Sequence, residues 1–189
     1  MSLRERKQQR AREEIIEAAF DLFAERGYAN VTVADIAERA EVGRTTFFRY
    51  FGDKQEVVFA GEQDWLDDVT TRHRAHEHTG PPTLTEAIAM LRDTVAAICA
   101  SATRNPGHYL RREQLIAENP ELEDRSARKQ RLFTSAITEI LREQGASAST
   151  SALAPQIALA CYTAGRLIAA GDPALLGPSV DAAFEQLFR

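Results

Sequence analysis

The stretch VGRTTFFRYFGDK, from Val42 to Lys54, places four aromatic residues within five consecutive positions, 47 to 51. On a helical wheel at about 100° per residue, Phe47 and Phe51 fall on one side, and Tyr50 lies at the edge of that side. A helix this short needs tertiary packing to form, because its own hydrogen bonds do not offset the cost of nucleation. We therefore expect this side to be part of a core.

The opposite side of the same helix has the chemistry of a surface that reads nucleic acid. It carries Thr45, Phe48 and Arg49, flanked by Arg44 and Thr46. Arginine can fork onto guanine in the major groove, while threonine and phenylalanine can touch a thymine methyl group. Plain helix packing would produce the same spacing of aromatic residues, so both interpretations remain open on the bare pattern.

Two helices are predicted before this stretch. Residues 13–26 have apolar positions at helical spacing and end at Gly27. Thr32 and Asp35 form a capping-box signal for a second, short helix, and Gly43 allows a tight turn into the third. Two short helices joined by a glycine-containing turn are the helix-turn-helix pattern.

The segment TVADIAERAEVGRTTFFRYFGDKQEVV, residues 32–58, resembles the DNA-binding segment of TetR-family transcriptional regulators. The similarity covers about residues 10–58, and the turn, the order of the aromatic residues and Lys54 all match in register. The resemblance implies contacts to bases or nearby phosphates for Arg44, Thr45 and Thr46, and contacts to the DNA backbone for Thr32, Tyr50 and Lys54.

This sequence departs from the family pattern at three positions. Glu41 replaces the usual glycine of the turn, Gly43 replaces the usual serine cap, and Phe48 replaces a tyrosine. Without a hydroxyl, Phe48 is expected to meet a thymine methyl group or a sugar rather than a phosphate.

The charges are distributed unevenly along the 189 residues. The chain carries a net charge of −5, yet residues 1–54 hold ten basic and ten acidic residues, so the acidity lies in residues 55–189. Residues 1–12 form a basic arm that can follow a phosphate backbone or simply be solvated. The first residues lack a secretory signal, and the two cysteines suggest no disulfide framework, so we expect a cytoplasmic protein.

The remainder of the chain is also predicted to be helical, so the expected fold class is all-α. A fourth helix is expected from Asp53 toward residue 75, followed by helices over 84–102, 109–117, 120–144 and 153–170 and a last helix after Gly177. Gln144 to Gly165 is uncharged but too polar in its first half to cross a bilayer, and we interpret it as a linker followed by a buried helix. The predicted organisation is an arm over 1–12, a helix-turn-helix domain over 13–52 and a helical ligand-binding and dimerisation domain over 53–189.

The family resemblance implies that the C-terminal domain forms a homodimer through its last two helices and holds a pocket for a small-molecule effector. The nearly uncharged helix 153–170 and the apolar face of the last helix support the dimer independently. Interface candidates are Leu153, Ile157, Cys161, Ala164, Val180, Phe184, Leu187 and Phe188. Pocket candidates are Trp65, Met90, Thr94, Tyr109, Gln114, Phe133, Tyr162 and Arg166, each of which also fits ordinary core or surface.

Other chemistry finds little support in the sequence. His73, His76 and His78 resemble a metal cluster, but only the first pair shares a helical face, and neither a metal site nor a cofactor is expected. No nucleophile motif or phosphate loop is present, so we do not expect an enzyme. The family resemblance implies a ligand-responsive regulator, a repressor released from a palindromic DNA operator by its effector. The alternatives are an activator, an effector-independent regulator, or a helical carrier or enzyme that does not bind DNA.

Overall fold

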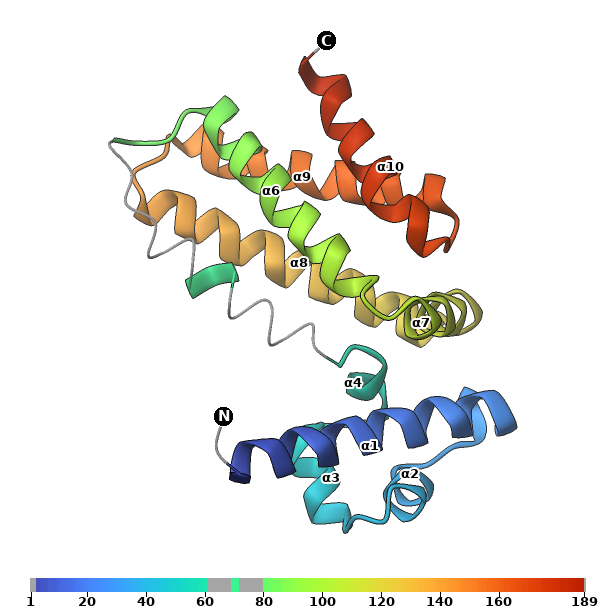
Figure 1. Cartoon of the computed structure of the whole chain (residues 1–189). Coiled ribbons are helices and arrows are strands. Elements are labelled where there is room, and N and C mark those ends of the chain that lie inside the picture. Colours follow the sequence, from blue (N-terminus) through green and yellow to red (C-terminus); the bar gives the residue numbers. More distant parts are fainter. Residues whose placement is uncertain (1–2, 61–68, 72–79, 189) are drawn as a thin grey trace. The chain divides into compact units, whose positions relative to one another are not determined.

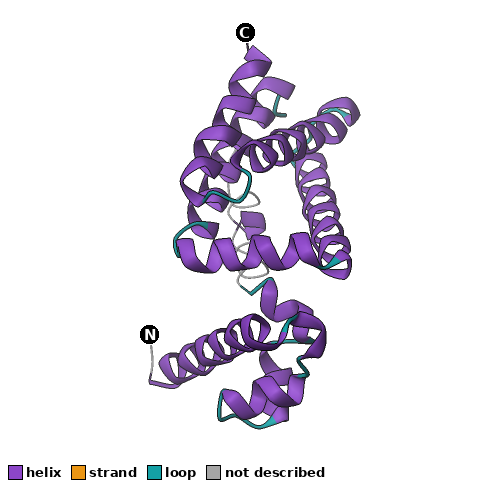
Figure 2. Cartoon of the chain, turned by 90° about the vertical axis from the view of Figure 1, so that its right-hand side faces the viewer, coloured by secondary structure: helices purple, strands orange, loops and turns teal. Residues whose placement is uncertain are grey.

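A computed structural model describes residues 3–60, 69–71 and 80–188. The chain divides into two compact units, Met1–Gln63 and Asp64–Arg189. Throughout the described residues the regular structure is helical and contains no strand, as Figure 2 shows. The predicted all-α fold class is therefore confirmed, and each unit is described by itself below.

The first unit is built on the long helix α1 (Leu3–Arg26), against which α2 (Val33–Arg39) and α4 (Lys54–Val58) pack (Figure 1). The recognition-type helix α3 (Arg44–Tyr50) packs on α2, and a single 3-10 turn, η1 (Tyr28–Asn30), follows α1. Apolar side chains from all of these elements are buried, among them Ile15, Leu22, Phe23, Ile36, Phe47 and Val57.

Helix α1 begins ten residues earlier than the sequence analysis places its start. Residues 3–12, expected as an arm, continue the helix without a break. Two side-chain pairs four residues apart support this extension, because Gln9 donates to Glu13 at 2.7 Å and Arg10 donates to Glu14 at 2.9 Å. The charged residues among 3–12, which favoured a tail in the sequence, are instead part of the solvated first turns of α1.

The fourth predicted helix is shorter than expected. Asp53 caps α4 by accepting from the backbone N–H of Glu56 at 2.8 Å, as the sequence predicts. The helix nevertheless ends at Val58, and Phe59 and Ala60 form a turn. Gly61 comes next in the sequence, and a glycine at this distance is a helix-stop signal that the sequence analysis overlooked. Residues 69–71 are helical again, and the other residues expected in this helix, 61–68 and 72–75, lie outside the described ones.

The second unit contains α6 (Leu84–Ala102), α7 (Pro106–Glu118), α8 (Pro120–Glu143), α9 (Ala148–Ala169) and α10 (Pro173–Glu185), followed by the turn η2 (Gln186–Phe188). Helix α9 packs against α6, α8 and α10, and α7 packs against α8 (Figure 1). A capping box of Thr83 and Glu86 opens α6, and Asn105 caps α7. An apolar cluster drawn from α6 to α10 forms the core of this unit.

Residues 148–152, expected as a linker, are the first turns of α9. Ser147 supplies the N-cap, since its side chain accepts from the backbone N–H of Thr150 at 3.0 Å. Within the described residues, α9 is the one helix whose length and mean hydropathy of 1.2 would allow it to cross a membrane. One side of α9 is buried against its neighbours, and its other side carries exposed apolar residues that are considered below.

Helices α9 and α10 approach each other very closely at Gly165. A Cβ atom at this position would lie 2.5 Å from the backbone N and Cα of Val180 and would also collide with the Val180 side chain. Only glycine permits this approach of two backbones. The packing of the last two helices is therefore set by one residue whose importance its sequence context does not reveal.

Candidate nucleic-acid interface

Helix α3 is anchored by the two aromatic residues that the sequence assigns to the core. Phe47 is completely buried and Phe51 nearly so, and their ring centroids are 5.8 Å apart. The guanidinium of Arg12 lies 5.7 Å from the centroid of the Phe51 ring, which ties α1 to the end of α3. The prediction that this half of α3 faces the core is confirmed.

The other half of α3 is presented to solvent. Arg44, Thr45, Phe48 and Arg49 are exposed, and Thr46 is half-buried. Within the described residues, the side chains of Arg44 and Thr45 take part in no hydrogen bond or ion pair. Donors without an internal partner at the start of a helix are available to base edges and phosphates.

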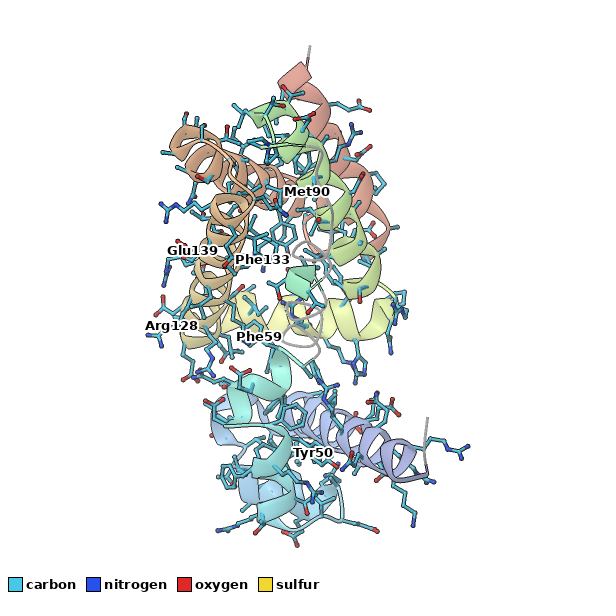
Figure 3. The ribbon with its side chains drawn as sticks, turned by 90° about the vertical axis from the view of Figure 1, so that its left-hand side faces the viewer. Tyr50, Phe59, Met90, Arg128, Phe133 and Glu139 are labelled. Carbon is cyan, nitrogen blue, oxygen red and sulfur yellow. The ribbon has the colours of Figure 1, made fainter. Side chains whose placement is uncertain are left out.

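Arg49 and Tyr50 form a pair at the end of α3. The guanidinium carbon of Arg49 lies 5.0 Å from the centroid of the Tyr50 ring, and Nη2 of Arg49 lies 3.4 Å from the Tyr50 hydroxyl. Tyr50 itself is half-buried (Figure 3). The cation and the hydroxyl therefore lie side by side at the surface, where both can donate to a phosphate.

Phe48 is 54% exposed although it is a large apolar residue. Its ring packs edge-to-face on Phe47, with centroids 5.5 Å apart and an interplanar angle of 85°. This contact fixes the direction of the Phe48 ring without covering it. An oriented, exposed ring without a hydroxyl suits apolar contact with a thymine methyl group or a sugar.

The hydroxyl of Thr32 is already engaged within its own helix start. Its oxygen accepts from the backbone N–H of Asp35 at 3.2 Å, and it donates to the Asp35 carboxylate, which also accepts from the backbone N–H of Thr32 at 2.8 Å. The hydrogen bonds from the Thr32 side chain and backbone lower the pKa of Asp35, helped by Arg26 at 3.5 Å. A phosphate contact by Thr32 would therefore have to displace a carboxylate.

The turn between α2 and α3 requires a left-handed backbone at Glu41, where φ is 53°. The turn is closed by the backbone N–H of Val42, which donates to the carbonyl of Ala37 at 2.9 Å. Glycine adopts this conformation without steric cost, which explains why the related pattern has glycine here. Glu41 accordingly holds a strained position in the middle of the helix-turn-helix.

Lys54 has internal partners, which the sequence analysis did not anticipate. Its ammonium donates to the backbone carbonyls of Tyr28 at 2.9 Å and Val31 at 3.1 Å, and it lies 4.2 Å from the centroid of the Tyr28 ring. Lys54 thus joins the first turn of α4 to the chain between α1 and α2. The predicted phosphate contact would have to use what remains of its hydrogen-bonding capacity.

A forked ion pair fixes α2 against α1. The two terminal nitrogens of Arg39 donate to the two carboxylate oxygens of Glu25 at 2.9 and 2.8 Å. The hydrogen bond from Arg39 is the main cause of the lowered pKa of Glu25. This pair holds α2, and through the turn it orients α3.

The pocket candidates fall into different environments. Tyr109 is buried, Tyr162 and Phe133 are packed against the core of the second unit, and all three come from different helices. Figure 3 shows Phe133 on the inner side of α8, toward Met90 of α6, whereas Arg128 and Glu139 point outward from α8.

Two further pocket candidates, Thr94 and Gln114, have described surroundings. Thr94 is buried, but its hydroxyl donates to the carbonyl of Met90 in its own helix at 2.9 Å. Gln114 is exposed and pairs with Glu118 at 2.8 Å, so it does not face the core, contrary to its inclusion among pocket residues. Trp65 lies outside the described residues, as do His73, His76 and His78.

The structure adds Glu113 to the polar residues of this core. Glu113 accepts from Nε of Arg166 at 2.6 Å, and its side chain is 11% exposed. Sequence reasoning missed it because an isolated glutamate in a charged helix reads as solvated. The sequence did contain a signal for it. On α7, Glu113 follows Tyr109 by four residues, and on α9, Arg166 follows Tyr162 by four residues, so each helix has a tyrosine and a charged residue on one face, and the two charges are opposite.

The interface candidates separate into two groups. Leu153, Ala164 and Leu187 are exposed and Ile157 is half-buried, so these can meet a partner. Cys161, Val180 and Phe184 are buried in the core of the protomer itself, which corrects their assignment to an interface. The side chain of Phe188 lies outside the described ones. Sequence alone could not separate these groups, because α9 and α10 are apolar around most of their circumference.

The exposed apolar residues that sequence analysis missed extend the first group. Leu167 is 80% exposed and Ile168 is 66% exposed, and Leu175 at the start of α10 is also exposed. On α9 the spacing from Leu153 through Ile157 and Ala164 continues to Leu167 and Ile168 in steps of three, four and seven. Together these residues, called the α9 stripe below, form an apolar surface on one side of the helix.

The two thiols show no sign of reactivity. Cys99 and Cys161 are both buried, and burial raises the pKa of the Cys99 thiol to about 11. Burial raises the pKa of Cys161 as well. Both side chains therefore behave as small apolar residues of the core.

Comparison with known proteins agrees with the geometry of the first unit. Residues 15–60 match the family model described as bacterial regulatory proteins, tetR family. The HTH-type transcriptional regulator TcmR of Streptomyces glaucescens is 49% identical over 56 residues, which cover 30% of this chain and 25% of TcmR. The matched region thus spans about a quarter of the length of this curated relative.

Solved structures extend the similarity of fold over nearly the whole chain. SmeT in its complex with triclosan superposes with a TM-score of 0.60 at 18% identity, covering 93% of this chain and 88% of SmeT. Thermus thermophilus FadR, a TetR-family repressor in complex with lauroyl-CoA, gives a TM-score of 0.51 at 23% identity, covering 94% and 91% of the two chains. Residues 15–60 therefore form a helix-turn-helix segment of the type found in bacterial regulatory proteins of the tetR family, and nearly the whole chain shares the helical fold of SmeT and FadR.

Proposed function

We propose that this protein is a transcriptional regulator that binds double-stranded DNA through α3. The observation that carries the proposal is the division of α3 into a buried side, formed by Phe47 and Phe51, and an exposed side, on which Arg44 and Thr45 have no internal partner among the described residues. A protein that used this helix only for packing would have no need to display these donors. The named relatives are transcriptional regulators, which agrees with this proposal and not with an enzyme.

The roles within α3 follow from position along the helix. Arg44 and Thr45 lie at its N-terminal end, which a helix-turn-helix presents to base edges in the major groove. Arg49 and Tyr50 lie at the other end and contact the phosphate backbone, and Phe48 between them makes apolar contact. Thr46, half-buried, contributes at the margin of this surface.

The functional unit is a homodimer that binds a palindromic operator. The α9 stripe supplies an apolar surface that a monomer would leave in water, and a second copy of the same stripe is its natural complement in a two-fold dimer. One α3 from each subunit then enters successive major grooves, about 34 Å apart.

Regulation by a small molecule bound in the second unit completes the proposal. SmeT and the Thermus thermophilus FadR, which share the fold, were each solved with a small molecule bound. An effector that binds better to a dimer whose two α3 helices do not match the operator shifts the population away from DNA. The protein then acts in the cytoplasm as a repressor that its effector releases.

Selection of bound fragments from genomic DNA tests the proposal. The wild-type protein should enrich a palindromic sequence, and Arg44→Ala should weaken binding to that sequence by about 1–3 kcal/mol while relaxing preference at one base pair. Arg128→Ala removes the same charge from an exposed position of the second unit and should leave base preference unchanged. Enrichment of no sequence, or an Arg44→Ala variant that binds like the wild type, would contradict the assignment.

A further inference from the structure

Tyr109 has a buried hydroxyl without a partner. The residue is 2% exposed, and its hydroxyl forms no hydrogen bond within the parts of the chain that the structure describes. Burial raises the pKa of Tyr109 well above its ordinary value, and the negative charge of Glu113 raises it further, so the hydroxyl keeps its proton. A buried donor left unsatisfied is costly, which implies that a polar group belongs next to it.

An ion pair between side chains of two helices lies near Tyr109. Glu113 lies one turn after Tyr109 on α7, and Arg166 of α9 donates from Nε to Glu113 at 2.6 Å. Because this ion pair begins one turn after Tyr109, its charges affect the pKa of Tyr109: Glu113 raises it and Arg166 lowers it. They form a polar cluster beside the apolar core of this unit.

Two residues of this cluster have open hydrogen-bond donors. Arg166 uses Nε for Glu113, and its two terminal nitrogens take part in no hydrogen bond within the described residues. The proton of the Tyr109 hydroxyl is a further donor. The carboxylate of Glu113, in contrast, already accepts from Arg166 and lies 3.7 Å from the guanidinium of Arg112. An acceptor satisfies the open donors of Arg166 and Tyr109, and a planar carboxylate fits the paired nitrogens of a guanidinium.

The side chains around the polar cluster indicate that the rest of the ligand is apolar. Tyr109 belongs to the apolar cluster that includes Leu91 and Val95 of α6, and Met90 and Phe133 pack against the same cluster. Phe133 reaches it from the inner side of α8 (Figure 3). A ligand whose polar end meets Tyr109 has its remaining atoms among apolar side chains.

We propose that Tyr109 and Arg166 form the polar end of an effector site for a small apolar molecule that carries one carboxylate. The inference rests on the proposed function, because it assigns a chemical class to the effector of the second unit. Arg166 receives the carboxylate on its terminal nitrogens, Glu113 holds the guanidinium in place, and Tyr109 donates the remaining hydrogen bond.

Calorimetric titration of the full-length protein with three probes that share one apolar body tests this class. Naphthoate is the carboxylate, naphthylmethanol the neutral probe and naphthylmethylamine the cation. Naphthoate should bind most tightly and the amine least, because the amine meets the positive charge of Arg166. Tyr109→Phe should weaken naphthoate about tenfold by removing one charge-assisted hydrogen bond, and it should leave naphthylmethanol less affected.

Two further variants show whether a change in naphthoate binding comes from the polar cluster or from a general disturbance of the second unit. Arg166→Lys keeps the positive charge but loses the planar pair of nitrogens, and it should also weaken naphthoate. Gln114→Ala alters the exposed side of α7 and should bind all three probes as the wild type does. Thermal unfolding of each variant shows whether the second unit is intact.

Three outcomes would contradict the proposed carboxylate site. Equal binding of naphthoate and naphthylmethanol, absence of naphthoate binding, or a Tyr109→Phe variant that binds naphthoate like the wild type each overturns the assignment. Direct measurement of DNA binding without probe distinguishes this failure from that of the proposed function. A protein that binds its operator but not naphthoate remains a regulator with another effector class, whereas one that binds naphthoate but no DNA contradicts only the proposed function.

Discussion

The ammonium of Lys54 lies 4.2 Å from the centroid of the Tyr28 ring and donates to the carbonyl of the same residue at 2.9 Å. Lys54 is the first residue of α4, and Tyr28 follows the end of α1, so a single side chain joins two elements that flank the helix-turn-helix. With its second bond to Val31, Lys54 is first of all a structural link of the DNA-binding unit.

Lys54→Met should lower the free energy of unfolding by about 1–2 kcal/mol, because it leaves two backbone carbonyls without this donor and removes a cation–π contact. Urea unfolding of the full-length protein measures the loss. Arg44→Met, which removes a cation with no internal partner, is the matched control and should leave stability unchanged. The opposite outcome is a Lys54→Met variant with wild-type stability, in which the slope of log DNA affinity against log salt concentration is smaller by about one. That outcome would identify Lys54 as a phosphate ligand.

Glu41→Gly should stabilise the protein by about 0.5–1 kcal/mol, since glycine adopts the left-handed conformation at this position without strain, partly offset by greater freedom of the unfolded chain. It should also tighten DNA binding by removing a negative charge from the turn. Glu41→Gln removes the charge but keeps the Cβ atom, so it should tighten DNA binding without the gain in stability. A loss of stability in Glu41→Gly, measured in urea, would argue against strain at the turn.

Leu167→Glu should convert the dimer to monomers in sizing experiments and leave the protomer folded, because Leu167 is 80% exposed and belongs to the α9 stripe. Phe184→Ala should behave in the opposite way. Phe184 is fully buried within the protomer, and its truncation should cost about 3–5 kcal/mol of stability, measured by thermal unfolding. Dimers that persist in Leu167→Glu would place the interface on another surface.

Gly165→Ala should destabilise the second unit by about 1–3 kcal/mol, because the added methyl group meets the backbone of Val180 rather than a flexible side chain. Gly177→Ala is the natural control. Position 177 lies within α10 and has no atom within 4 Å of an added Cβ atom, so the change should be neutral or slightly stabilising through helix propensity. Calorimetric scans measure the melting temperatures of both variants. Equal melting temperatures would mean that α9 and α10 can move apart at Gly165 without cost.

Much of the N-terminal unit was predictable because its signals are local. The capping box of Thr32 and Asp35, the division of α3 into a buried and an exposed side, and the N-cap at Asp53 all depend on residues three or four positions apart. Local hydrogen bonds and helical periodicity express such spacings directly. The predicted start of α1 and the predicted end of α4 were wrong, because charged residues and turn residues near the end of a helix mark that end only weakly.

The sequence by itself determined that this protein is helical, where its helix-turn-helix lies and which side of α3 faces outward. Only the tertiary structure decided what the long-range partners are: that Lys54 binds Tyr28, that Glu113 meets Arg166, that Gly165 admits Val180, and that Phe184 is core while Leu167 is surface. The physical reason is that periodicity reports which residues share a face of one helix. Which other helix covers that face depends on contacts between residues far apart in the chain, and an apolar helix such as α9 offers several faces that look equally suited to burial.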